Sequence, residues 1–423
     1  MKILHLAAND INGGAAIAAY RLHQGLLKYG VDSRMLVLYK KSDDPHVSQF
    51  YPSANIFKRL KRQIRERIID WRYDASIKKR LTDDEPYSDA RTPFIEEMLE
   101  KINDVDVINL HWTAKFIDYG HFFRTLSGHI PVVWTLHDMY PFTGGCHYTG
   151  DCHGYEGRCG MCPKLASTNE KDFSHINWDY KHKALSAIDD ASLHIVTPSK
   201  WLGGRAKASS LFSRFGNSVI PYGLDLDIYK PRDPSGLRGA LDIPLDANVI
   251  GFVADSLSDK RKGFSILAHA MEMLKKKNIY LISIGNNSPV ISKEVKHIHI
   301  GRVHVDGIMS LVYSLFDVFI CPSQEDNLPN TVLESLSCGT PVIGFDIGGM
   351  PDMIEHGVTG LLASNIDAMS LASSIEEIFS NKRNLQVMAG KCREKAVNDY
   401  ALNVQATNYS KLYATLLRMH QYS

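Results

Sequence analysis

Short apolar stretches alternate with amphipathic helical patterns along the chain, and the alternation runs through two rounds. In the first round, apolar runs predict a helix over residues 15–29 and strands over 2–7, 33–38, 105–110, 132–136 and 193–197. In the second round, they predict a helix over 263–274 and strands over 249–253, 280–284, 297–300, 318–321 and 342–345. Strands that alternate with helices are typical of parallel, doubly wound sheets. We therefore predict an α/β protein of two Rossmann-like domains that face each other across a cleft.

Prolines and charges interrupt this pattern near residues 225–234 and place a hinge between the two rounds. We expect an N-terminal, acceptor-side domain over residues 1–226 and a C-terminal donor domain over 227–402. The tail has helical apolar spacing, so residues 403–423 are predicted to form a helix that packs back on the N-terminal half. Two segments stand out in the N-terminal domain: a basic stretch over 56–80 and a cysteine-containing loop over 144–165.

Composition narrows the class of protein. The chain has 423 residues, which is too long for one ordinary core. Its net charge of +1 gives no global attraction to nucleic acid. No apolar run reaches membrane-spanning length, and the N-terminus lacks the pattern of a signal peptide. We therefore expect a cytoplasmic protein, whose seven cysteines are thiols or metal ligands rather than disulfides.

Residues 321–345, CPSQEDNLPNTVLESLSCGTPVIGF, give the strongest indication of chemistry. The segment reads as a strand end, a Pro/Ser loop, a helix that stops at Gly339 and a new strand. Asn330 is expected to cap the helix, so that free amides of the first turn face the loop. Such a loop is where open α/β sheets bind phosphate groups. Asp326 and Glu334 lie eight positions apart around it, and Glu334 is placed to hold the ribose of a nucleotide.

Three further features suit an anion. The pair Gly13–Gly14 joins the first strand to the first helix, where backbone amides can approach a phosphate. Lys262 precedes a predicted helix, where its charge can neutralise a diphosphate leaving group. A second pair, Gly348–Gly349, again lies between a strand and a helix, with Asp352 in the first turn. Structural interpretations stay open, because glycine turns are common and Lys260–Lys262 also suits a solvated basic face.

The two acids have structural interpretations as well. Asp326 alone reads equally as an ordinary turn residue, and Glu334 as an acid favoured by the helix dipole. Their combination with the other motifs favours a role of both acids in a binding site over these structural interpretations.

Together these motifs resemble those of the retaining GT-B glycosyltransferases of family four, the group 1 type. The matching text is PSQEDNLPNTVLESLSCGTPVIG, with two acids eight apart, and IPYGLDLDIYKP over residues 220–231. A Lys-Gly pair at Lys262–Gly263 opens the second domain, and Gly-Gly-Met-Pro-Asp over residues 348–352 follows the acid helix. The resemblance spans nearly the whole chain, and the combination is far more specific than any single phrase. It implies the GT-B fold and glycosyl transfer from a nucleotide sugar.

The resemblance implies roles by position. Glu334 would hold the donor ribose, Asp326 would face the transferred sugar, and Lys262 would meet the diphosphate. His137, in TLHDMY, matches a histidine that touches the sugar. The other donor-binding residues that we predict are Gly14, Arg261, Arg302, Val303, Leu328, Pro329, Asn330 and Thr331. There are two departures: Asp326 stands where the family usually has Glu, and Leu257 stands where it has an arginine, for which Arg261 is the candidate substitute.

We therefore predict a retaining glycosyltransferase, a hexosyltransferase type of enzyme. It would move a sugar from a UDP- or GDP-linked donor to a glycan or polyprenyl-linked saccharide in surface polysaccharide synthesis. No nucleophile–base pair stands out, so we expect transfer on one face of the sugar, with the leaving phosphate taking the acceptor's proton. No Asp-x-Asp stands in a suitable metal position, so catalysis is expected to need no metal cofactor. A nucleotide-sugar 2-epimerase of the same fold and a non-catalytic sugar-nucleotide binding protein are the alternatives.

Four cysteines gather in the loop GGCHYTGDCHGYEGRCGMCPKL: Cys146, Cys152, Cys159 and Cys162. The last two form a C-x-x-C turn, which is common in metal sites, and His147 and His153 are additional candidate ligands. This density suits a structural zinc. Free thiols and a redox pair are the alternatives.

The basic stretch contains an amphipathic helical pattern. One face carries Phe57, Leu60, Ile64, Ile68 and Trp71, while lysines and arginines fill much of the rest. The pattern is typical of a helix that lies on an anionic membrane, which would make the protein peripheral on the inner face of the membrane. A helix that buries its apolar face in the core is the alternative. Nucleic-acid binding is a third, without a recognition motif to support it.

Overall fold

The computed structural model describes residues 1–78, 86–94, 98, 102, 104–126, 130–274, 278–288 and 290–421. The chain forms two compact units: residues 1–220 with 406–423 make unit 1, and residues 221–405 make unit 2. The boundary at which the chain passes from unit 1 to unit 2 lies after Ile220, whereas we predicted the domain boundary after residue 226. The tail groups with unit 1 from Ala406 onward.

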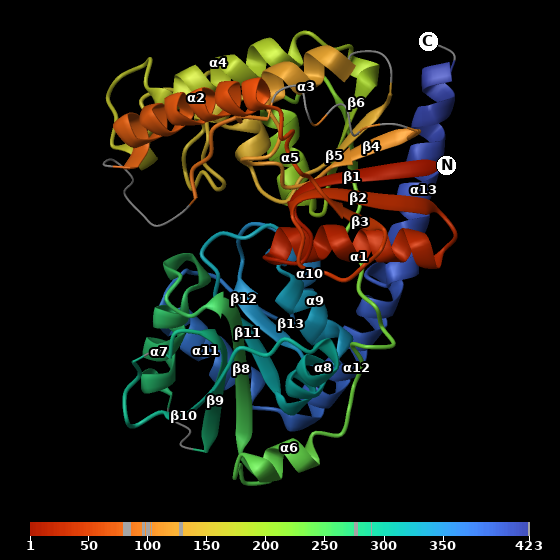
Figure 1. The fold of residues 1–423 in the computed structure, drawn as a ribbon. Helices are drawn as coiled ribbons and strands as arrows, with labels where there is room; N and C mark the ends of the chain where they lie inside the picture. The colour runs from red at the N-terminus through yellow and green to blue at the C-terminus, as the bar shows by residue number, and fades with distance from the viewer. Residues whose placement is uncertain are drawn as a thin grey trace. The chain divides into compact units, whose positions relative to one another are not determined.

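Unit 1 is built on a seven-stranded parallel sheet with the order β3-β2-β1-β4-β5-β6-β7 (Figure 1). The strands are β1 (Lys2–Asn9), β2 (Asp32–Tyr39), β3 (Val47–Gln49), β4 (Val107–Leu110), β5 (Val132–Thr135), β6 (Leu193–Thr197) and β7 (Gly216–Val219). The strand order reverses between β1 and β4, so the loops that follow these two strands diverge there, as in other doubly wound sheets.

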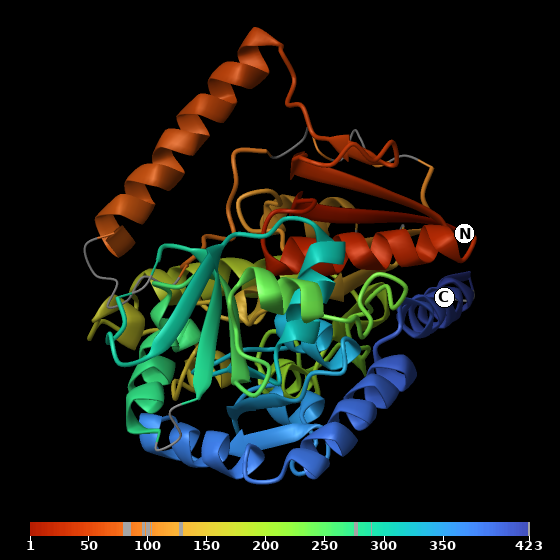
Figure 2. The same cartoon turned by 90° about the horizontal axis from the view of Figure 1, so that it is seen from below.

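The helices of unit 1 are α1 (Gly14–Lys28), α2 (Ile56–Tyr73), α3 (Tyr119–Leu126), α4 (Phe173–Leu185), α5 (Lys200–Ala208) and most of α13 (Leu402–Gln421). In both views α2 runs along the outside of this unit (Figures 1 and 2). Helix α13 is fixed to the sheet by two buried tyrosines. Asn109 Nδ2 donates to Tyr413 Oη at 2.7 Å, and Thr135 Oγ1 lies 2.9 Å from Tyr409 Oη. The tail is therefore part of the unit 1 core.

Unit 2 repeats the same topology with six parallel strands in the order β10-β9-β8-β11-β12-β13. The strands are β8 (Asn248–Ser256), β9 (Ile279–Asn286), β10 (Lys296–Gly301), β11 (Val318–Cys321), β12 (Val342–Phe345) and β13 (Gly360–Ala363). The helices are α6 (Ser235–Ala240), α7 (Phe264–Met273), α8 (Asp306–Leu315), α9 (Asn330–Ser337), α10 (Met350–Met353), α11 (Ala368–Ile378) and α12 (Lys382–Asp399). The order reverses between β8 and β11, which places the loops after these strands at the switch point of the sheet.

The structure confirms the predicted α/β class and the two Rossmann-like sheets, but three short strands escaped prediction. Strand β7 reads GNSV and has no buried residue, so it lacks the apolar run that marked the central strands. Strands β3 and β13 are three and four residues long. The predicted cap of α9 was wrong: the helix begins at Asn330, and Pro329 takes the N-cap position without a side-chain hydrogen bond.

Helix α2 also settles one alternative. None of its residues is buried, and Phe57 and Trp71 are 75% and 70% exposed. The interpretation of α2 as a core-facing helix is therefore wrong. None of the helices in the described part of the chain is long and apolar enough to cross a membrane.

Candidate functional site

The C-terminal edge of the unit 2 sheet brings two predicted segments into contact. The 3-10 turn Lys260–Lys262 follows β8, and the loop 322–329 follows β11. The Gln324 amide donates to the Arg261 carbonyl at 2.8 Å, which joins turn to loop. Gly263 has φ 74°, and a Cβ there would lie 1.9 Å from the Pro322 carbonyl oxygen. Only glycine fits between them, which gives the Lys-Gly pair a physical reason.

Asp326 lies at the centre of this contact. Its Oδ2 is 2.5 Å from Lys262 Nζ and 3.3 Å from Arg261 Nη1, and its Oδ1 accepts from the Asn327 amide at 3.0 Å. The side chain is buried, and burial disfavours its charge. The nearby cations Lys262 and Arg261 outweigh this effect and lower the pKa of Asp326 to about 2. Asp326 is therefore an anion that holds two cations at the strand edge.

A second glycine supports the same loop from the other side. The Gly349 amide donates to the Asp326 carbonyl at 3.0 Å, and a Cβ on Gly348, with φ 60°, would lie 2.2 Å from that oxygen. Asp352 falls in the first turn of α10, as predicted. The glycine pair thus allows close packing against the backbone of Asp326.

Glu334 lies in α9 and is held by a partner that we did not predict. Tyr313 of α8 donates from its hydroxyl to Glu334 Oε2 at 2.9 Å, and both side chains are buried. Burial and then the adjacent carboxylate raise the pKa of Tyr313 well above its usual range, so the hydroxyl keeps its proton and donates. Tyr313 therefore orients the carboxylate. Leu328 and Pro329 are buried between Asp326 and α9, and Asn330 and Thr331 form its first turn.

The remaining predicted residues of unit 2 follow β10. Arg302 Nη2 forms an exposed ion pair with Asp255 Oδ1 of β8 at 2.9 Å, and Val303 is half-buried. The structure thus brings Lys262, Arg261 and Asp326 into direct contact, and it places Arg302 in a separate pair at the ends of β8 and β10.

In unit 1, the predicted histidine belongs to a buried row of imidazoles. His137 follows β5, and its Nε2 lies 3.1 Å from Nδ1 of His111, whose Nε2 lies 2.8 Å from Nδ1 of His5. Burial lowers the pKa of His137 to about 4 and the pKa values of His111 and His5 well below their usual range. All three rings are neutral at pH 7, so the proton position on one ring fixes the proton position on the next. The polar His5 in the apolar strand LHLAA was a signal that we missed.

Gly14 is the first residue of α1, and Gly13 is its N-cap with φ 96°. This conformation favours glycine, and a Cβ on Gly13 would have no atom within 4 Å. The requirement at Gly13 is therefore one of backbone conformation rather than of space.

The cysteine loop shows four thiols without disulfides. His147, a candidate ligand, is engaged at both ring nitrogens: Nδ1 lies 2.7 Å from Asp138 Oδ2, and Nε2 lies 2.9 Å from Ser88 Oγ. His153 is exposed and pairs with Glu156 at 2.8 Å. Within the described ranges, no group of three or more His, Cys, Asp and Glu side chains is arranged to hold a metal ion. The arrangement gives a zinc site no support, and zinc in this loop stays a prediction.

Comparison with known proteins agrees with this geometry. Residues 247–381 match the family model "Glycosyl transferases group 1". N-acetyl-alpha-D-glucosaminyl L-malate synthase of Bacillus anthracis is 24% identical over 200 residues, which are 46% of this chain and 52% of that protein. D-inositol 3-phosphate glycosyltransferase of Mycobacterium tuberculosis is 26% identical over 177 residues, 38% of this chain and 35% of that protein. The chain thus spans about half, or less, of the length of these curated relatives.

A solved structure extends the likeness of fold to both units. Anabaena HepE in complex with UDP and glucose aligns with a TM-score of 0.67 and 16% identity, covering 98% of this chain and 99% of that one. Such a low identity shows the fold alone, which is the GT-B fold. Residues 247–381 are therefore a domain of the glycosyl transferases group 1 family, in a chain with the GT-B fold.

Proposed function

We propose that this protein is a retaining glycosyltransferase that moves a sugar from a nucleotide-sugar donor to a glycan or lipid-linked saccharide in surface polysaccharide synthesis. The observation that carries the proposal is the contact of Lys262 and Arg261 with Asp326, beside α9 with Glu334, inside the group 1 domain. Arg261 also pairs with Asp259 at 3.7 Å, and Lys260 completes a turn of three consecutive cations at the switch point of a parallel sheet. A diphosphate is a fitting ligand for that charge.

The site residues divide the work of transfer. Lys262 and Arg261 are positioned to neutralise the diphosphate as it leaves, and the first-turn amides of α9 add their dipoles. Glu334, oriented by Tyr313, is the group for the ribose hydroxyls. Asp326 faces the transferred sugar. The acceptor attacks on the face that the diphosphate leaves, and the departing phosphate oxygen takes the proton of the acceptor hydroxyl, so the configuration is retained.

UDP is our first choice of donor nucleotide, because Anabaena HepE shares the fold and has been solved with UDP and glucose. A thermal-shift screen with UDP, GDP and their sugars tests this choice, followed by transfer assays across acceptors. Binding without turnover on every acceptor would argue for a binding protein, and release of an altered sugar nucleotide would argue for an epimerase. Transfer should persist in excess chelator; complete loss that magnesium restores would refute metal independence.

We also propose that unit 1 places the protein at the inner face of a membrane. The support is α2, whose apolar face is exposed while its other faces carry lysines and arginines. That combination complements an anionic lipid surface. Replacing Phe57 and Trp71 with Glu should abolish co-sedimentation with anionic vesicles. Unchanged co-sedimentation of this variant would refute the membrane proposal.

A further inference from the structure

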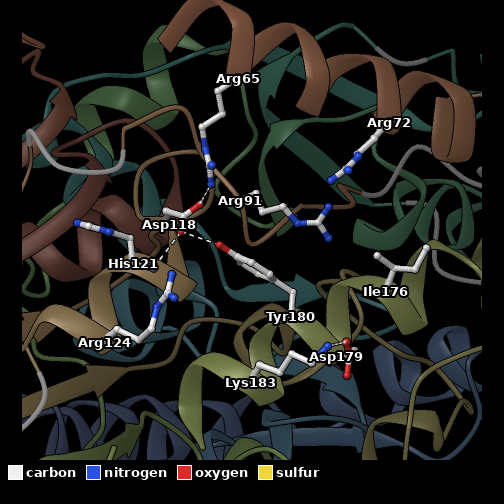
Figure 3. A pocket seen from close by; sticks show the side chains of 10 residues that line it. All are labelled: Arg65, Arg72, Arg91, Asp118, His121, Arg124, Ile176, Asp179, Tyr180 and Lys183. Atoms are coloured by element: carbon white, nitrogen blue, oxygen red, sulfur yellow. Dashed lines mark hydrogen bonds and ion pairs between the residues drawn. The ribbon is translucent and has the colours of Figure 1, made fainter. Parts of the chain in front are cut away.

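A basic cavity of about 490 Å³ lies in unit 1 (Figure 3). It opens among α2, α3 and α4; Arg65 and Arg72 of the predicted basic stretch line it, whereas none of the predicted catalytic, donor-binding or metal residues does. Its cations are Arg65, Arg72, Arg91, Arg124 and Lys183. Its carboxylates are only Asp118 and Asp179 among the described residues, so five cations face two anions.

Both carboxylates are already engaged. Asp118 Oδ2 pairs with Arg65 Nη2 at 2.7 Å, and Asp118 Oδ1 accepts from the Tyr180 hydroxyl at 2.7 Å (Figure 3). Asp179 Oδ2 pairs with Lys183 Nζ at 2.6 Å. The acids therefore order the walls of the cavity, and they do not neutralise the remaining arginines.

Arg91 is a buried cation of this cavity that is only partly paired. Its side chain is only 8% exposed, and its guanidinium lies 5.0 Å above the Tyr180 ring. Its Nε lies 3.4 Å from Asp89 Oδ1 in an ion pair, and within the described residues this Nε has no hydrogen-bond partner. A buried guanidinium N–H without an acceptor is costly, and an oxyanion can supply the acceptor. Arg72 reaches down from α2 toward Arg91 (Figure 3).

We propose that this cavity binds the phosphate or diphosphate group of a lipid-linked acceptor. Guanidinium groups bind phosphate oxygens in pairs, which fits a cavity with four arginines. The lipid source follows from α2, because Ile64 and Arg65 are consecutive. They lie roughly 100° apart around the helix, so the exposed apolar stripe borders the face that lines the cavity. A headgroup bound by Arg65 and Arg72 would then place its lipid along that stripe. The inference rests on the proposed function, since it identifies the chemistry of the acceptor.

The first test is a titration with inorganic pyrophosphate. Saturating UDP keeps the donor site of unit 2 occupied. The variant carries Arg72→Gln and Arg124→Gln, both exposed on helix surfaces. The control carries Arg59→Gln and Arg67→Gln, which remove the same charge from α2 outside the cavity. We expect about tenfold weaker pyrophosphate binding for the cavity variant and little change for the control, since two ion pairs are lost. Equal affinities of wild type and cavity variant would overturn the proposal.

A second variant guards against misfolding. Arg91→Lys keeps a positive charge beside Asp89 but removes the guanidinium fork, so it should also weaken pyrophosphate binding at an unchanged melting temperature. Unchanged affinity would mean that Arg91 does not contact the anion.

Vesicles separate the sources of phosphate. Phosphatidylcholine vesicles that contain phosphatidic acid expose a phosphomonoester, whereas those with phosphatidylserine offer matched charge without it. The wild type and the control should prefer phosphatidic acid, and the cavity variant should lose that preference. Equal binding to both vesicles would overturn the lipid source and assign the cavity to a free phosphate ester.

Failure of the proposed function looks different from failure of this inference. If unit 2 binds no nucleotide, UDP binding and transfer are absent while pyrophosphate still binds the cavity of unit 1. If the cavity has no role, UDP binding and transfer persist while Arg72→Gln with Arg124→Gln has no effect on pyrophosphate.

Discussion

Asp326→Asn is the sharpest test of the site in unit 2, because one substitution separates the stability of the loop from binding of the nucleotide. The carboxylate holds Lys262 and Arg261, and its pKa is lowered from 3.8 to about 2. At about 1.4 kcal/mol per pKa unit, this shift corresponds to about 2 kcal/mol of stability at pH 7. Because the asparagine variant loses this pKa shift, its free energy of unfolding at pH 7 should be about 2 kcal/mol lower than that of the wild type.

The pH dependence follows from the sign of the shift. A lowered pKa in the folded state stabilises the protein above pH 4, and the stabilisation disappears as the pH falls through 2. Urea unfolding at pH 7 and at pH 3 measures it, and at pH 3 the difference between wild type and variant should shrink to about half. Asp346→Asn is the matched control, because Asp346 is an exposed aspartate in the same unit. A loss at pH 7 no larger than that of the control would refute the reasoning.

The same variant should bind UDP at least as tightly as the wild type, since Lys262 and Arg261 no longer share their charge with Asp326. Transfer should nevertheless fall strongly, because the proposed contact of Asp326 with the sugar would be lost. Calorimetry with UDP measures the first effect, and initial rates with the UDP-sugar measure the second. UDP binding that is weakened tenfold by Asp326→Asn would show that the acid supports the diphosphate rather than the sugar.

Three other predictions follow from the contacts of both units. Tyr313→Phe should weaken UDP binding about fivefold by freeing Glu334, at roughly 1 kcal/mol for the lost hydrogen bond. The same variant should not weaken binding of dideoxy-UDP, which lacks the ribose hydroxyls. Equal losses of affinity for both ligands would exclude the ribose contact. His137 has a pKa lowered to about 4, so the folded state favours its neutral form and the protein loses stability as the pH falls below 6.5. Between pH 7 and pH 5 the His137→Gln variant should therefore lose about 2 kcal/mol less of its free energy of unfolding than the wild type. Identical pH dependence of the two proteins would contradict the buried neutral ring. The zinc predicted in the cysteine loop should appear as one zinc per chain in metal analysis, and chelator should raise the number of thiols that titrate; equal thiol counts with and without chelator would contradict it.

Contiguous segments could be predicted from the sequence, whereas contacts between distant residues could not. The strand, loop and helix of residues 321–345 carry their own apolar periods and glycine stop, and the structure has β11, α9 and β12 there. The Lys262–Gly263 turn was visible as a motif, but its close approach to Pro322 needed the fold. Tyr313 lies 21 positions from Glu334, and His5 lies 106 positions from His111. Neither pair has any local pattern that links its members.

Helix α2 shows how an amphipathic pattern and the structure contribute different parts of an argument. The period of its apolar residues fixes which side chains share a face, but the same period fits a core helix and a membrane helix equally well. Burial excludes the core helix, because none of the α2 residues is buried, and the vesicle assay tests the membrane helix. The structure then adds what the period could not indicate. Arg65 and Arg72 lie two turns apart on one face of α2 and line a cavity. The other lining residues come from later parts of the chain, as far as Lys183. Under the two proposals, one face of α2 meets lipid and the adjacent face meets phosphate, so a headgroup at that border would contact both.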